Sequence, residues 1–186
     1  GFLTPMPFTA EYDYTYDGIM RSYEDSLQRL GLARIDVLLV HDIGIVTHGA
    51  ENEKHFSDLR KSGYKALDEL RKNGDVGAIG LGVNEWEVCE QAMKIGQFDC
   101  FLLAGRYTLL EQKPLDHFLP KCLEYGASLI VGGAYNSGIL ATGTRNSQPI
   151  YYNYEEAPQN IIESVQKIEN LCDQFKVTLA AAALQF

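Results

Sequence analysis

The chain has 186 residues, of which 46% are hydrophobic and 22% are charged. This composition is that of an ordinary globular protein, and the length predicts one domain with a sizeable core. A formal net charge of -9 disfavours binding to nucleic acid or to an anionic membrane surface, because both need a basic face. No apolar run approaches the roughly 20 residues that cross a bilayer, and the N-terminal residues lack the pattern of a signal peptide.

Cysteine and histidine spacings point to neither disulfides nor a metal centre. The cysteines are far apart and form no CxxC pair: Cys89, Cys100, Cys122 and Cys172. We therefore expect buried, reduced thiols in a cytoplasmic protein. Three histidines lack ligand spacing with any cysteine or carboxylate pair: His48, His55 and His117. No metal site is predicted.

The first quarter of the chain predicts an irregular segment, a helix and a strand. Residues 1–16 contain Pro5, Pro7 and an aromatic cluster, formed by Tyr12, Tyr14 and Tyr16. Asp17 is expected to cap a helix that ends at Gly31. Its apolar positions step by three and four: Met20, Tyr23, Leu27 and Leu30. The apolar run Val37 to Val40 then predicts a strand covered on both faces, which ends at His41.

The next unit repeats this plan. A polar connection is expected to about residue 60, before a helix with three inward apolar residues, Tyr64, Leu67 and Leu70. This helix should end at Asn73-Gly74. Residues 76–83 predict a glycine-rich strand. Asn84 and Glu87 have the spacing of a capping box, and the following helix should run to about Lys94.

Two further units complete the pattern. A strand over 100–104 precedes a helix over 114–125, which Pro120 should kink or restart. A strand over 128–134 is followed by the linker 141–157, which is rich in tyrosine, asparagine and glycine. Pro158 suits a first helical position, and Thr178 opens a final apolar segment, 179–186. Between them lies an apolar stripe, formed by Ile161, Val165, Ile168, Cys172 and Phe175.

Four consecutive βα units predict an α/β fold with a parallel sheet. Two closures compete, an open doubly wound sheet and a (β/α)8 TIM barrel. Gly80-Leu81-Gly82 lacks the third glycine of a dinucleotide fingerprint. A whole barrel needs about 250 residues, and this chain supplies about half the strands. Since a half-barrel would expose two unpaired strand edges, we expect the sequence to be part of a longer polypeptide.

His41 is the first candidate for chemistry. It follows a buried strand directly, and ligand crevices in α/β folds lie at the carboxyl ends of the strands. Its unperturbed pKa lies near neutrality, which suits proton transfer and hydrogen bonding to a reacting group. The structural alternative is a histidine that only ends the strand. Asp42 should point to the opposite face if the strand continues.

Several runs together resemble one family. They are the stretch 17–32 (DGIMRSYEDSLQRLGL), the stretch 35–42 (IDVLLVHD), the stretch 67–74 (LDELRKNG), Ala78-Ile79-Gly80, the stretch 105–110 (GRYTLL) and the stretch 135–140 (YNSGIL). In this order they resemble the aldo-keto reductases. The resemblance is closest to the sugar 1-dehydrogenase branch, the D-threo-aldose (L-fucose) dehydrogenases and the related pyridoxal 4-dehydrogenases. It covers nearly the whole chain.

The resemblance implies a (β/α)8 barrel that binds NAD or NADP without a Rossmann domain. The family's catalytic set is Asp, Tyr, Lys and His, and His41 matches the histidine. The other three lie on segments that this sequence does not contain. We therefore expect residues 1–186 to form a partial barrel domain that lacks its first and last strands and does not catalyse alone.

The resemblance also implies cofactor contacts. Tyr135 matches an aromatic residue that stacks on the nicotinamide, although it could be a core or rim aromatic. The loop after it is expected to offer free N–H groups to a pyrophosphate, or to be a simple turn: Asn136, Ser137, Gly138, Ile139 and Leu140. Asn84 could hold the carboxamide or merely cap its helix.

Two departures from the family pattern concern the carboxamide. Gly82-Val83-Asn84 stands where many members carry Ser-Asn, and Ala104 stands where many carry glutamine. Arg106 and Tyr107 could compensate, or could be structural. In the linker, three tyrosines could stack on a sugar or lie in a mobile surface loop: Tyr151, Tyr152 and Tyr154.

The implied function is NAD(P)-dependent oxidation of an aldose of the L-fucose or D-threo-aldose type at C1 to the lactone. A tyrosine whose pKa a lysine lowers would take the hydroxyl proton, and neutral His41 would orient the substrate oxygen. The expected partner is a small sugar or aldehyde. The alternative is a truncated, catalytically silent half-barrel that acts by binding or self-assembly. The sequence leaves the cofactor, the sugar and the oligomeric state open.

Overall fold

The computed structural model describes residues 9–147 and 149–186. The expected irregular segment 1–16 therefore lies partly outside the described residues, and Pro5 and Pro7 with it. Residues 9–15 contain no helix or strand, as expected.

A four-stranded parallel sheet forms the centre of the fold. Its strands are β1 (Ile35–His41), β2 (Val76–Val83), β3 (Cys100–Ala104) and β4 (Ser128–Gly132), and they lie side by side in sequence order. The predicted parallel α/β sheet is confirmed. Four consecutive βα units produce this strand order when each new strand pairs with the strand that precedes it in the sequence. β4 is shorter than predicted and ends at Gly132, because the next residue, Gly133, has a left-handed conformation with a φ of 61°.

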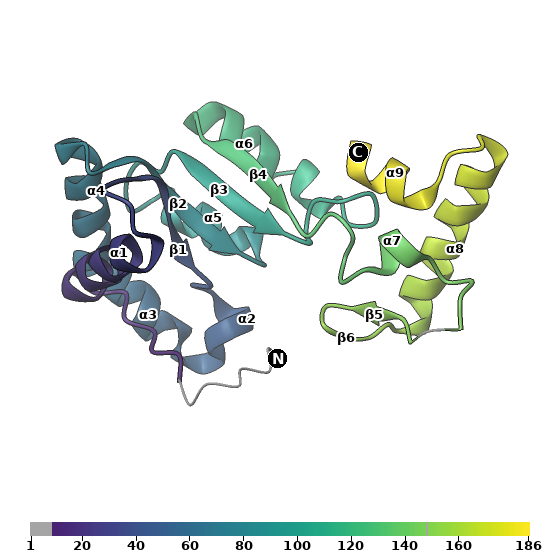
Figure 1. The fold of residues 1–186 in the computed structure, drawn as a ribbon, viewed down its shortest axis with the longest axis horizontal. Coiled ribbons are helices and arrows are strands. Elements are labelled where there is room, and N and C mark those ends of the chain that lie inside the picture. Colours follow the sequence, from purple (N-terminus) through teal and green to yellow (C-terminus); the bar gives the residue numbers. More distant parts are fainter. Residues whose placement is uncertain (1–8, 148) are drawn as a thin grey trace.

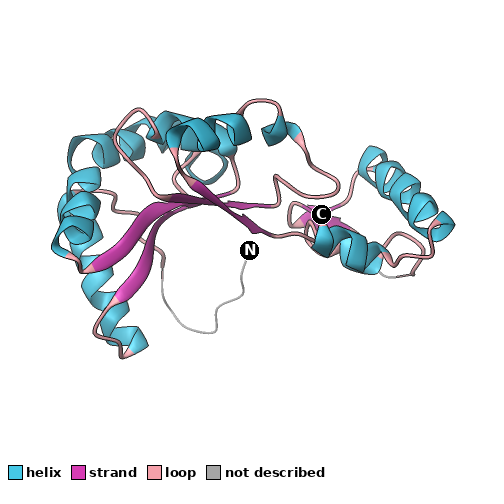
Figure 2. Ribbon diagram, turned by 90° about the horizontal axis from the view of Figure 1, so that it is seen from above, coloured by secondary structure: helices cyan, strands magenta, loops and turns pink. Residues whose placement is uncertain are grey.

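The helices cover one face of this sheet, as Figure 2 shows. Leu81 and Phe101 are fully buried on the covered face. On the other face, Val37 is 44% exposed and Ile130 is 41% exposed. The expectation that the first strand is covered on both faces is therefore wrong, because the described residues supply no second layer over it.

Helix α1 (Tyr16–Leu30) begins two residues earlier than expected. Thr15, not Asp17, is its N-cap, and the Thr15 hydroxyl accepts a hydrogen bond from the Gly18 N–H. Asp17 lies in the first turn, where its charge favours the positive end of the helix dipole. Gly31 ends the helix in the left-handed conformation, as predicted.

The connection after β1 is largely helical. It contains α2 (Ile45–His48), the 3-10 turn η1 (Gly49–Glu51), α3 (Asn52–Asp58) and the π-helical turn η2 (Leu59–Gly63), which leads directly into α4 (Tyr64–Asn73). The sequence predicts a polar connection here. Three of its apolar residues, Ile43, Phe56 and Leu59, are buried in the core, whereas Ile45 and Val46 are exposed. The buried residues hold the segment as helix.

Helix α4 buries Leu67 and Leu70 and ends at Gly74 in the left-handed conformation, as predicted. Helix α5 (Trp86–Ala92) covers the sheet after β2, and it ends before Lys94. The helix expected over 114–125 is two pieces, the 3-10 turn η3 (Lys113–Leu115) and α6 (Phe118–Tyr125). Proline at 120 lies in the first turn of α6, where its missing N–H leaves no helical hydrogen bond unmade.

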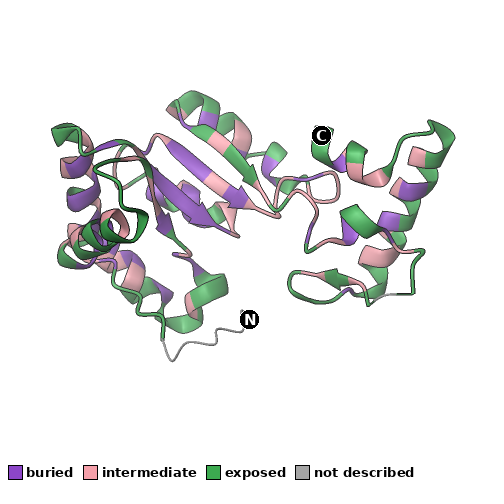
Figure 3. Ribbon diagram, in the orientation of Figure 1, coloured by how far each residue is buried: buried purple, intermediate pink, exposed green. Residues whose placement is uncertain are grey.

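The C-terminal part forms a second, smaller cluster beside the sheet (Figure 1). It contains α7 (Ile139–Thr142), the antiparallel pair β5 (Tyr151–Tyr152) and β6 (Glu155–Glu156), α8 (Gln159–Gln174) and α9 (Leu179–Gln185). The long linker is thus partly structured. Leu140 and Val165 are fully buried at the centre of this second cluster. Figure 3 shows buried, intermediate and exposed positions along α8.

The caps of these last helices differ in part from expectation. Pro158 is the N-cap of α8, one position before the first helical residue. Thr178 caps α9, and its hydroxyl accepts from the Ala181 N–H. Phe175 belongs to the predicted stripe but is 72% exposed, so the stripe is buried only near the middle of α8.

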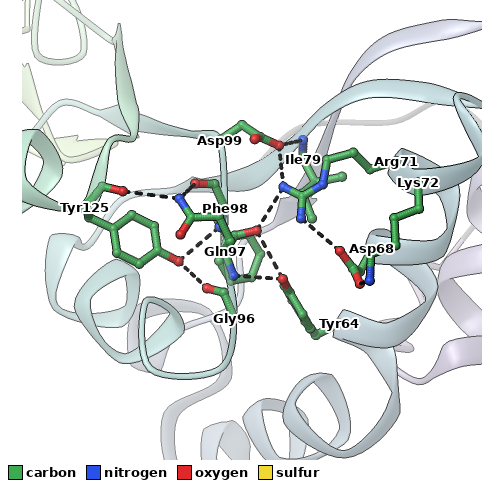
Figure 4. A network of polar contacts seen from close by, with 10 residues as sticks. All are labelled: Tyr64, Asp68, Arg71, Lys72, Ile79, Gly96, Gln97, Phe98, Asp99 and Tyr125. Carbon is green, nitrogen blue, oxygen red and sulfur yellow. Dashed lines mark hydrogen bonds and ion pairs between the residues drawn. The ribbon is translucent and has the colours of Figure 1, made fainter.

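A polar network at the amino ends of the strands joins α4 to the turn before β3 (Figure 4). The Asp99 carboxylate accepts from the Ile79 N–H and from the Arg71 guanidinium, both at 2.8 Å. Arg71 also donates to Asp68 at 2.9 Å. Tyr64 donates to the Gln97 carbonyl at 3.2 Å. This network lies at the end of the sheet opposite the carboxyl ends of the strands, where ligands of α/β folds bind. Its role is therefore to hold strands and helices together.

We predict that Asp99→Ala lowers the free energy of unfolding of the full-length protein by about 1–3 kcal/mol. The substitution removes a charge-assisted bond and leaves the Ile79 N–H without its carboxylate partner. Chemical denaturation measures the loss. The exposed pair of Arg60 and Glu53 supplies the control, and Glu53→Ala should stay within about 0.5 kcal/mol. Equal effects of both variants would contradict this role.

A second prediction concerns acid stability. Hydrogen bonds from Lys72 and then Arg71 hold the pKa of Asp68 below its usual value of 3.8. A carboxyl whose folded pKa is depressed stabilises the fold above its unfolded pKa and loses that contribution as the pH falls. Asp68→Asn should therefore flatten the decline of unfolding free energy below about pH 4. Parallel pH curves for the two proteins would exclude this contribution.

Candidate functional site

The carboxyl ends of the four strands meet at one edge of the sheet. Beyond the last residue of β1, the Asp42 N–H donates to the Gly82 carbonyl at 2.8 Å. Beyond β3, the Gly105 N–H donates to the Gly132 carbonyl at 2.8 Å. The pairing therefore continues into the loops, which start from a common edge. In parallel α/β folds this edge carries the ligand site.

His41 ends β1 at this edge, and 80% of its side chain is exposed. Its Nδ1 lies 3.6 Å from the Asp42 carboxylate. Asp42 has a φ of 51°, so the extended strand stops there and the carboxylate lies beside the imidazole instead of on the opposite face. The ring is thus open to a ligand and has an acidic neighbour.

A cluster of aromatic and imidazole rings lies behind His41. The Tyr14 hydroxyl is 2.9 Å from the His41 carbonyl oxygen and 2.8 Å from Nε2 of His48. The centroids of the His48 and His55 rings are 4.2 Å apart. The sequence analysis considered these histidines only as metal ligands. They lie on different helices, His48 at the end of α2 and His55 in α3, so helical spacing does not predict their contact.

Asn84 does not cap the helix after β2. The N-cap of α5 is Glu85, and no side chain caps that helix. The Asn84 amide instead donates to the Ala104 carbonyl at 3.1 Å and thereby joins the ends of β2 and β3. The expected capping box is therefore wrong, because Asn84 turns toward the neighbouring strand end.

The loop after Tyr135 is a tight turn whose N–H groups are mostly used. The Asn136, Gly138, Ile139 and Leu140 N–H groups each donate to a main-chain carbonyl of the same turn or of Gly133. The premise of several free N–H groups is therefore wrong for these four. Ile139 and Leu140 are also buried in the second cluster. Of this loop, Ser137 is exposed, and its hydroxyl accepts from the Tyr154 N–H.

Asn136 fixes this turn to the loop after β3. Its side chain is buried and accepts from the Thr108 hydroxyl at 2.6 Å, while its amide donates to the Gly105 carbonyl at 3.0 Å. Its φ of 45° is left-handed, a conformation that asparagine tolerates better than most residues. Asn136 is therefore a structural link between strand ends, and Tyr135 beside it is half-buried.

Arg106 joins the sheet edge to the β5–β6 pair. Its Nε donates to the Asn84 carbonyl at 2.8 Å, and its guanidinium also donates to the Asn153 side chain at 2.8 Å. In the same hairpin the Tyr152 hydroxyl donates to Glu111, and burial together with this bond raises the pKa of Tyr152 to about 12. The tyrosine-rich linker is thus anchored over the sheet edge.

Two hollows lie beside the carboxyl ends of the strands. One, of about 490 Å³, is lined by Asn84, Trp86, Arg106 and Tyr152 among others. The other, of about 550 Å³, runs between α1 and the free edge of β1 and includes His41. Hydrogen bonds connect Asn84, through Arg106 and the Gly105 loop, to the turn after Tyr135. Among the described residues no hydrogen bond, ion pair or ring contact joins His41 to Tyr135.

The thiols offer no reactive centre at this edge. Cys89, Cys100 and Cys122 are free and buried, as predicted, and Cys172 is half-buried. Burial raises the pKa of the Cys122 thiol to about 11, and it raises that of Cys89 further. These thiols therefore stay protonated at neutral pH. Within the described ranges, no cluster of three histidine, cysteine or carboxylate side chains could hold a metal.

We predict that Asn136→Ala loosens the turn after Tyr135 and destabilises the protein by about 1–3 kcal/mol. The change leaves the Gly105 carbonyl and the Thr108 hydroxyl without their buried partner. Amide hydrogen exchange should rise across residues 135–140. Ser137→Ala, at an exposed neighbour, is the control. Unchanged exchange in Asn136→Ala would contradict its linking role.

Comparisons with known proteins give the chain a family context. A sequence model described as the aldo/keto reductase family matches residues 5–186. A pyridoxal 4-dehydrogenase of Microbacterium luteolum is 46% identical over 187 residues, covering 100% of this chain and 54% of that protein. A D-threo-aldose 1-dehydrogenase of a Pseudomonas species is 35% identical over 186 residues, with the same coverage. The chain thus spans about half the length of these curated relatives.

Solved structures agree on the fold. A glycerol dehydrogenase of Gluconobacter oxydans superposes with a TM-score of 0.67 at 18% identity, covering 98% of this chain and 55% of that one. An aldo-keto reductase of Bacillus halodurans gives 0.59 at 23% identity, covering 77% and 45%. With the four parallel strands, this likeness confirms the expected partial barrel. In the described part of the chain, no helix combines the length and apolarity needed to cross a bilayer.

Proposed function

We propose, from the premise that this chain belongs to the aldo/keto reductase family, that residues 1–186 are part of a nicotinamide-dependent dehydrogenase. Its reaction is oxidation of a small sugar of the L-fucose or D-threo-aldose type at C1 to the lactone. The names of two relatives, a pyridoxal 4-dehydrogenase and a D-threo-aldose 1-dehydrogenase, support dehydrogenation of a small carbonyl compound or sugar. NAD and NADP remain equal candidates, and a cytoplasmic location fits the free cysteines.

The observation that carries this proposal is the exposed imidazole at the end of β1. His41 has 80% of its side chain open at the edge where parallel strands present their ligand site. A neutral imidazole there can donate a hydrogen bond to the hydroxyl oxygen of the substrate. It orients that oxygen while a general base removes its proton.

The described residues fit the nicotinamide end of such a cofactor better than its pyrophosphate. The half-buried ring of Tyr135 can stack on a flat heterocycle, and the Asn84 amide lies between the ends of β2 and β3. Four N–H groups of the turn at 136–140 are already used, so a pyrophosphate cradle there is not part of the proposal. When bound, the nicotinamide supplies the hydride acceptor.

Two substrate classes share one chemical feature. An aldose in its ring form has a cyclic hemiacetal carbon, and pyridoxal can form one with its own hydroxymethyl group. Oxidation of either gives a lactone. The higher identity to the pyridoxal 4-dehydrogenase, 46% against 35%, makes pyridoxal the second candidate. Assays of the full-length protein with L-fucose, D-arabinose, L-galactose and pyridoxal, each with NAD and NADP, decide between them.

We predict that His41→Ala in the full-length protein lowers kcat/KM for its best substrate at least about tenfold. The reason is loss of the group that orients the reacting oxygen, an effect within the usual range for acid–base groups. Steady-state kinetics with either cofactor measures it. His117→Ala is the matched control, since His117 is exposed and lines neither hollow.

Kinetics of His41→Ala that equal those of the unmodified enzyme would refute the proposed role. The alternative of a catalytically silent half-barrel is not favoured, because the family match spans residues 5–186 and both named relatives are dehydrogenases. Absence of dehydrogenase activity in the full-length protein with every substrate and cofactor pair would restore it.

A further inference from the structure

The residue that holds His41 from behind is Tyr14. We propose that Tyr14 is a positioning residue, which fixes the main chain of His41 through a hydrogen bond that His48 completes. The proposal rests on the proposed role of His41 and adds a determinant of its geometry. Tyr14 itself is 6% exposed, and its hydroxyl meets the main chain of His41.

The geometry of β1 shows where the Tyr14 contact lies. Within the described residues β1 pairs with β2, and Tyr14 meets the opposite side of the strand end. The Asp42 N–H donates to Gly82, the register partner of His41, so the carbonyl of His41 itself points away from β2. The Tyr14 hydroxyl meets this carbonyl at 2.9 Å. The end of the strand is therefore held from both sides.

The hydrogen bonds of Tyr14 determine which ring nitrogen of His48 carries a proton. Tyr14 has one hydroxyl proton, and a carbonyl oxygen can only accept, so that proton goes to the His41 carbonyl. The contact of 2.8 Å between the Tyr14 oxygen and Nε2 of His48 then requires His48 to be the donor. His48 must carry its proton on Nε2. Burial raises the pKa of Tyr14, so its hydroxyl keeps the proton that it donates.

The groups around His48 favour the neutral ring. Burial and then the neighbouring His55 lower the pKa of His48, while Asp42 acts in the opposite direction. Tyr12 packs edge-on against the His48 ring, with centroids 4.7 Å apart. These three neighbours, with Tyr14, are the titratable groups found to face His48 among the described residues. A neutral ring protonated on Nε2 is therefore the form expected at pH 7.

A hydrogen bond to the main chain can matter for catalysis because a shift of the strand end moves the imidazole that it carries. Among the described residues, the polar contact of the His41 side chain is the one with Asp42. A displacement of about 1 Å in a reacting group can reduce rates by up to about a hundredfold. Loss of the Tyr14 bond should therefore lower kcat by about five- to fiftyfold, with KM changed less than about threefold.

The test is Tyr14→Phe in the full-length enzyme, which keeps the ring and removes the hydroxyl. The matched control is Tyr23→Phe. Tyr23 is also buried, at 7% exposure, and its hydroxyl donates to a main-chain carbonyl, that of Asp75, at the other end of the sheet. Both variants should lose similar thermal stability. Tyr14→Phe alone should lose kcat, and an equal loss in both variants would reduce Tyr14 to a general structural role.

A second readout does not depend on activity. Nitrogen-15 NMR of the histidine rings should show His48 protonated on Nε2 at pH 7, and this signal should shift in Tyr14→Phe and stay in Tyr23→Phe. If Nε2 of His48 carries no proton, Tyr14 donates to His48 instead of His41, and the proposal is overturned. This result stands even where Tyr14→Phe folds poorly, because it is read in the unmodified protein.

Variants at His48 give a third comparison. His48→Gln can place an amide N–H close to the position of Nε2, whereas His48→Leu cannot donate. His48→Gln should therefore retain a several-fold higher kcat than His48→Leu, and equal values would overturn the part assigned to His48. An unmodified enzyme without activity, or a neutral His41→Ala, would refute the proposed function itself. Activity that depends on His41 but not on Tyr14 would refute the positioning role alone.

Discussion

The parallel register of four strands is the constraint on which the whole account depends. It aligns His41 with Gly82 and, through β2, with Leu102 of β3 and Ile130 of β4. Because all four strands run the same way, their loops emerge at one edge. Hydrogen bonds beyond the strand ends then extend the alignment into the residues that carry polar side chains.

Much of this arrangement could be predicted from the sequence. Apolar runs located the strands, and Gly31 and Gly74 marked helix ends, because glycine adopts the left-handed conformation that closes a helix without strain. The position of His41 after an apolar run indicated its place at the strand end. Local signals of this kind are strong because they depend on a residue and its immediate neighbours.

The rest depends on contacts between distant segments. Asn84 has the spacing of a capping residue, yet its amide binds the Ala104 carbonyl, twenty residues away. Tyr14 and His48 are 34 residues apart and meet behind His41. No local pattern encodes these pairings, because they join segments that are 20 and 34 residues apart in the sequence.

The central claim is that the His41 ring contacts the reacting oxygen of a small hydroxyl or carbonyl substrate. The most direct measurement is a crystal structure of the full-length protein with nicotinamide cofactor and a substrate analogue. The account predicts a ring nitrogen of His41 within about 3.2 Å of the analogue's oxygen, on the side away from Tyr14. An analogue bound elsewhere, with the His41 ring facing only solvent, would contradict it.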